Sequence, residues 1–171
     1  MELINDLATW AWARHHNIAS WYVRPLFLLP FCYFAYRRSL SGITITLVAL
    51  ATSMAWFPAP ATPSPAVVEM LAAERDYLFG PWNAAKVAVS LIIPATFTAL
   101  ALTFWRRSFT WGLVVINGAV LFKIGWTYAV SGAAGATAHL VPALAGLVLV
   151  NAIVLGAARL VARRRTVARP A

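Results

Sequence analysis

Long apolar runs separated by short polar stretches form the main pattern of the chain, and they predict helices that cross a membrane. An α-helix rises about 1.5 Å per residue, so about 20 residues cross a hydrocarbon core about 30 Å thick. Five runs approach this length, at residues 18–36, 40–57, 82–105, 109–130 and 139–161. We therefore expect an all-α integral membrane protein whose bundle of five transmembrane helices occupies residues 17–162.

Two further segments carry apolar residues at helical spacing, with charged residues between them. Residues 1–16 and 66–79 show this pattern, which is typical of helices that lie in the membrane interface. Their apolar positions are Leu3, Ile4, Leu7, Trp10 and Ala11 in the first, and Val67, Met70, Leu71 and Leu78 in the second. We expect two interfacial amphipathic helices on the outer face. The second either folds over the mouth of the bundle or rests on lipid headgroups.

The composition supports a membrane protein. Hydrophobic residues make up 61% of the chain and charged residues 11%, whereas soluble domains carry about 25% charged residues. The single cysteine, Cys32, excludes a disulfide within the chain and a cysteine-based zinc site. The net charge of +9 does not indicate nucleic-acid binding, because the apolar runs leave no basic face with exposed aromatic residues.

The basic residues cluster where they predict the orientation of the spans. Arginines follow the first and third predicted spans and lie at or after the end of the fifth: Arg37, Arg38, Arg106, Arg107, Arg159, Arg163, Arg164 and Arg165. With five spans all of them fall on one side, which the positive-inside rule assigns to the cytoplasm. The amino terminus then lies outside, and residues 163–171 form a basic cytoplasmic tail. Small size and arginine placement favour a bacterial inner membrane, with membrane lipids as partners.

Three cations fall inside the outer ends of the predicted spans, and they are the first candidates for function. They are Arg24, Lys86 and Lys123. A charge in a span costs about 2.5–3.5 kcal/mol on insertion scales, so such residues mark functional sites. Asn83 at the same depth, with Glu74 and Asp76 on the outer loop helix, completes a candidate ligand site. Pairing with these carboxylates, binding of an external anion, and snorkelling to the headgroups all stay open.

Two asparagines, Asn117 and Asn151, are expected at similar depth on the fourth and fifth spans. Their amides would hydrogen-bond across the interface, a structural role that contributes about 0.6 kcal/mol on average in membrane bundles. Gly118 and Gly146 nearby would let these helices approach closely.

The three histidines, His15, His16 and His139, are all expected at the outer face. Adjacent His15 and His16 point about 100° apart on a helix, so they would not hold one ion together. We predict no metal and no cofactor, with haem or a histidine-bound metal as the alternative.

The predicted function is binding or conducting an anionic or amphiphilic ligand, including lipid, at an outer-facing polar pocket. The chain carries no nucleophile, phosphate-binding or metalloprotease motif, so a non-enzymatic protein is expected. The alternatives are an accessory subunit of a larger membrane complex, an enzyme that modifies outer-leaflet lipids through a histidine–carboxylate pair, and a haem carrier. A homo-oligomer or a larger membrane complex stays open as the assembly.

Overall fold

The structure is a computed structural model that describes residues 2–167, without the side chains of residues 4, 130–139 and 165–167. All the elements in this part of the chain are helices. Four helical segments are long and apolar enough to cross a membrane, which agrees with a multi-pass membrane protein. They are Ile18–Tyr36, Ala84–Trp105, Phe109–Ala129 and Leu140–Arg164.

The first of these segments stays continuous although Arg24 and Pro25 interrupt its apolar run. It consists of α2 (Ile18–Val23), a 3-10 turn η1 (Arg24–Phe27) and α3 (Leu28–Tyr36). Pro25 stands at the start of η1, where its missing N–H is tolerated best. Gly146 packs directly on Pro25, because a Cβ added at Gly146 would overlap the proline ring.

The second predicted span is shorter than the others. Helix α4 (Leu40–Thr52) has 13 residues, and the 3-10 turn η2 (Ser53–Ala55) adds three. Together they reach about 24 Å at 1.5 Å per residue. Ser39 caps α4, since its Oγ accepts a hydrogen bond from Gly42 N at 3.2 Å. The prediction of a fifth span at 40–57 therefore rests on an apolar helix that falls below the length of the other four.

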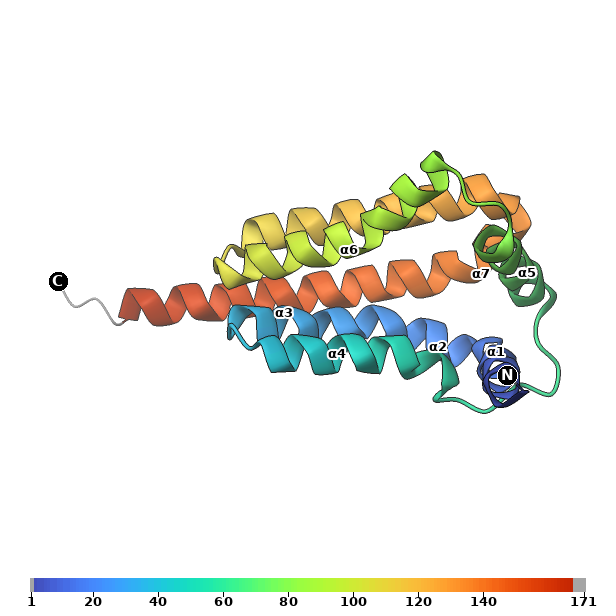
Figure 1. Cartoon of the computed structure of the whole chain (residues 1–171). Helices are drawn as coiled ribbons and strands as arrows, with labels where there is room; N and C mark the ends of the chain where they lie inside the picture. The colour runs from blue at the N-terminus through green and yellow to red at the C-terminus, as the bar shows by residue number, and fades with distance from the viewer. Residues whose placement is uncertain (1, 168–171) are drawn as a thin grey trace.

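Helix α6 (Ala84–Trp105) leads into α7 (Phe109–Val167), which reverses direction (Figure 1). The predicted hydrogen bond joins its two arms: Asn117 Nδ2 donates to Asn151 Oδ1 at 2.9 Å, and Asn151 Nδ2 donates back at 3.3 Å. Along a straight helix these residues would lie about 51 Å apart. The expected role of Gly118 is wrong, because no atom lies within 4 Å of a Cβ added there, and Gly146 meets Pro25 instead.

Two hydrophobic clusters lie at different levels of the bundle. The larger joins α3, α6 and both arms of α7 through Phe31, Cys32, Ala35, Leu100, Phe104, Ile116, Val150 and Val154. The smaller joins α2 to α5 (Pro65–Phe79) through Trp21, Val67, Met70 and Leu71, with Trp12 from α1 (Glu2–His15) packed against it. Three residues of the apolar stripe of α5, Val67, Met70 and Leu71, are thus buried, whereas Leu78 stays exposed. Helix α5 lies over one end of the bundle (Figure 1).

Candidate ligand site at the α1 and α5 end

A histidine–carboxylate pair links the two short helices at this end of the bundle. His15 is the last residue of α1, and its Nε2 lies 3.8 Å from Glu74 Oε2 on α5. The histidine is only 3% exposed, whereas the Glu74 side chain keeps 37% of its surface. His15, which was expected at the outer face, is therefore a buried residue at the end of the bundle that carries α1 and α5.

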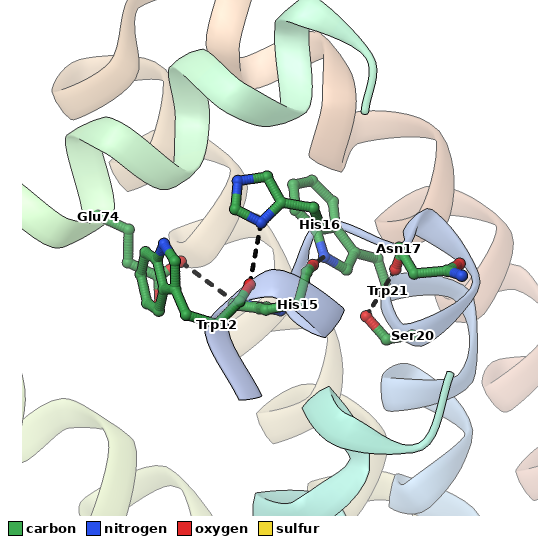
Figure 2. A network of polar contacts seen from close by, with 7 residues as sticks. All are labelled: Trp12, His15, His16, Asn17, Ser20, Trp21 and Glu74. Carbon is green, nitrogen blue, oxygen red and sulfur yellow. Dashed lines mark hydrogen bonds and ion pairs between the residues drawn. The ribbon is translucent and has the colours of Figure 1, made fainter. Parts of the chain in front are cut away.

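Two tryptophans enclose the His15 ring (Figure 2). Its centroid lies 5.8 Å from the Trp12 ring and 6.1 Å from the Trp21 ring. Trp21 Nε1 also donates a hydrogen bond to His15 O at 3.1 Å, which ties α2 to the end of α1. His15 Nδ1 is buried without a hydrogen-bond partner. A general base must reach the proton of its substrate. Because this nitrogen is buried, His15 Nδ1 is not placed to act as a general base in the present conformation.

Asn17 sets the angle between α1 and α2. Asn17 is the N-cap of α2, because its Oδ1 accepts a hydrogen bond from Ala19 N at 3.0 Å. Ser20 Oγ donates to Asn17 O at 2.8 Å (Figure 2). Asn17 Nδ2 donates to Pro58 O at 2.9 Å, so the same residue also holds the chain after α4. This polar turn positions Arg24 one to two helical turns further along.

Arg24 and Lys123 both lie within electrostatic range of Glu74. Glu74 interacts electrostatically with both cations, and the two cations also act on each other. Arg24 Nε is buried and has no hydrogen-bond partner. In the part of the chain that the structure describes, neither Arg24 nor Lys123 forms a hydrogen bond or a close ion pair. Lys123 also keeps exposed surface. This group therefore holds two incompletely paired cations beside one carboxylate.

Lys86, the third predicted cation, is engaged elsewhere. It is 8% exposed, and its Nζ donates to Gly80 O at 3.0 Å and to Leu78 O at 3.5 Å. The ammonium also lies 4.9 Å from the Tyr77 ring centre and 4.5 Å from that of Trp82. Leu78 lies in the last turn of α5 and Gly80 is its C-cap, at the end of the helix where the dipole favours a cation. Lys86 thus clamps the end of α5 to the start of α6.

Asp76 and Asn83 share a cavity of about 470 Å³ with Lys86, bounded by α5, α6 and the first arm of α7. Trp126 and Val89 supply apolar walls. Asn83 is also the N-cap of α6, because its Oδ1 accepts a hydrogen bond from Lys86 N at 2.9 Å. The cavity lining includes neither Arg24, Lys123 nor Glu74.

The predicted six-residue pocket therefore divides into two groups. Arg24, Lys123 and Glu74 form one, and Asp76, Asn83 and Lys86 form the other. The sequence reading missed the aromatic residues that build both places, Trp12 and Trp21 around His15 and the Tyr77–Trp126 contact at 6.1 Å. Nothing local in the sequence indicated which charged residues these aromatic side chains would enclose.

The remaining histidines supply no metal site in the part of the chain with described side chains. His16 follows the end of α1, and its Nδ1 lies 2.9 Å from Trp12 O in that helix. The prediction for His139 lies outside the described side chains. No group of three histidine, cysteine or acidic side chains that could hold a metal ion occurs among the described residues.

Comparison with known proteins adds no assignment. No protein-family profile, no curated protein and no solved structure matches this chain.

Proposed function

We propose that this membrane protein binds the acidic headgroup of an amphiphile between Arg24 and Lys123, at the end of the bundle that carries α1 and α5. The observation that carries the proposal is the charge balance there. Two cations interact with one carboxylate, Glu74, and the buried Nε of Arg24 has no hydrogen-bond partner. An acidic headgroup would supply the missing negative charge beside the two cations.

Burial raises the free-energy cost of leaving the Arg24 donor unpaired, and it strengthens the hydrogen bonds that a charged ligand would form. A buried donor without a partner costs about 1–3 kcal/mol, and hydrogen bonds to charged groups contribute about 1.5–3 kcal/mol. Guanidinium is suited to carboxylate and phosphate, which it binds through two parallel hydrogen bonds. Since α1 exposes Leu3 and Leu7 at this end, the surroundings also suit the apolar tail of an amphiphile.

The test is binding of dodecyl phosphate and dodecanoate to the purified protein in a neutral detergent, followed by isothermal calorimetry. Dodecanol serves as the uncharged probe of the same chain length. We expect Arg24→Gln and Lys123→Gln each to weaken binding of an acidic probe about tenfold or more, as for loss of one charged hydrogen bond. Preference for dodecyl phosphate or for dodecanoate identifies the headgroup.

Arg75→Gln is the matched control, because Arg75 is an exposed cation next to Glu74 on the same helix. It removes the same charge, and binding should change by less than twofold. If the Arg24→Gln/Lys123→Gln protein binds both acidic probes as the parent does, the proposed site is wrong. Equal binding of dodecanol would show that the tail alone accounts for the affinity.

We further propose five spans, with the amino terminus outside and the basic turns in the cytoplasm of a bacterial inner membrane. The antiparallel packing of α4 on α3 supports a fifth crossing. A single-cysteine test separates five crossings from four. In a Cys32→Ser background, Ser41→Cys and Ala72→Cys place a thiol at exposed positions in the first turn of α4 and on α5. An impermeant maleimide added outside should label only Ala72→Cys. Labelling of both would mean that α4 does not cross.

A further inference from the structure

A short motif occurs twice in the chain, at the two helix ends opposite α1 and α5. Residues 36–39 and 105–108 both read aromatic–Arg–Arg–Ser, as Tyr-Arg-Arg-Ser and Trp-Arg-Arg-Ser. The first follows α3 and the second follows α6. The two turns lie at the same end of the bundle (Figure 1).

The two turns share one backbone geometry. Arg38 and Arg107 have positive φ angles of 57° and 58°, an unfavourable conformation for a residue other than glycine. After α3, Ser39 N donates to Phe34 O at 2.9 Å. After α6, Ser108 N donates to Thr103 O at 2.9 Å. These bonds define the Schellman motif that closes a helix end. Each turn thus presents its arginines in the same arrangement.

Each turn also reaches across to the other. Arg38 Nε donates a hydrogen bond to Trp105 O at 3.3 Å, and the Arg107 guanidinium lies 5.3 Å from the Tyr36 ring centre. One arginine from each turn is therefore used to hold the two turns together. The remaining pair, Arg37 and Arg106, is exposed. Neither forms a hydrogen bond or ion pair within the described part of the chain.

The charge at this end is not balanced by acids. All five acidic residues of the chain lie on α1 and α5, at the opposite end: Glu2, Asp6, Glu69, Glu74 and Asp76. Both turns directly follow or precede apolar helices that are long enough to cross a membrane. The free guanidinium groups are thus at headgroup depth.

We propose that the paired arginine turns bind the headgroup of an anionic lipid that carries two phosphates, one phosphate at Arg37 and the other at Arg106. Guanidinium pairs with phosphate through two parallel hydrogen bonds. Basic sites between transmembrane helices bind phosphate-rich lipid headgroups for this reason. A single-phosphate lipid would engage one turn only. This surface lies away from the Arg24–Lys123 group, so the two proposals stand independently.

The experiment is native mass spectrometry of the full-length protein with three lipids: tetraoleoyl cardiolipin with two phosphates, dioleoylphosphatidylglycerol with one, and zwitterionic dioleoylphosphatidylcholine. We expect cardiolipin to bind most tightly. Arg37→Gln/Arg106→Gln should weaken cardiolipin about thirtyfold, from about fivefold for each arginine at a membrane surface. It should weaken phosphatidylglycerol less.

Arg14→Gln/Arg75→Gln removes two charges at the opposite end and should leave cardiolipin binding within about twofold of the parent. The proposal is overturned if cardiolipin binds no more tightly than phosphatidylglycerol, or if both double variants lose the same affinity. It is also overturned if inorganic pyrophosphate competes with the lipid at equal concentration, because the site would then recognise a free anion. Circular dichroism of each variant confirms that the helices are retained.

Discussion

Replacing Lys86 by methionine tests whether this lysine is a structural clamp or part of the ligand site. Methionine keeps an unbranched apolar side chain but has no charge and no donor. The variant loses the hydrogen bond to Gly80 O at 3.0 Å, the longer one to Leu78 O and the contacts with two aromatic rings. Because all these partners belong to the end of α5 and the chain that follows it, the loss falls on the α5–α6 junction.

The magnitude follows from these contacts. A hydrogen bond from a charged donor contributes about 1.5–3 kcal/mol, and cation–π contacts contribute about 0.5–2 kcal/mol. The variant no longer has the desolvation cost of a buried ammonium, and this gain offsets part of the loss. We expect a net local loss of about 2 kcal/mol, which corresponds to amide exchange about thirtyfold faster in α5. The measurement is hydrogen–deuterium exchange followed by mass spectrometry on peptides from residues 65–79.

Val87→Met is the control, because Val87 is an exposed neighbour on the same helix. Amide hydrogen exchange in α5 of Val87→Met should match that of the parent protein. Binding of dodecyl phosphate should also be unchanged in Lys86→Met, since Lys86 lies apart from Arg24 and Lys123. Unchanged α5 exchange, or a loss of binding equal to that of Lys123→Gln, would refute the separation of the two groups.

Two further predictions concern the contacts between spans. Gly146→Ala should destabilise the protein by about 1–3 kcal/mol, because the new Cβ would overlap Pro25; thermal unfolding should show no such loss for Gly118→Ala, where the space is open. A double-mutant cycle of Asn117→Ala and Asn151→Ala should give a coupling energy of about 0.6 kcal/mol by unfolding in mixed micelles. Strict additivity would contradict a direct bond between the amides.

Much of the fold was predictable because its determinants are local. Helix length and apolar content depend on consecutive residues, so the four long spans could be read from the runs that contain them. The Asn117–Asn151 bond was also predictable, since two antiparallel helices of known ends place residues of equal depth side by side. The closing geometry of the arginine turns was not anticipated. No glycine marks it, and Arg38 and Arg107 adopt the left-handed conformation instead.

The sequence by itself therefore determined the helical class of the protein and the approximate ends of its four long apolar segments. The tertiary structure alone decided which charges meet. Arg24, Lys86 and Lys123 were expected at similar depths, yet depth leaves the direction around each helix axis open. Docking of α5 places Glu74 beside a buried His15 and within electrostatic range of Arg24 and Lys123. The turn between α5 and α6 instead provides the backbone carbonyl that accepts a hydrogen bond from Lys86. Both outcomes depend on contacts between segments far apart or on the path of a turn, which no local pattern encodes.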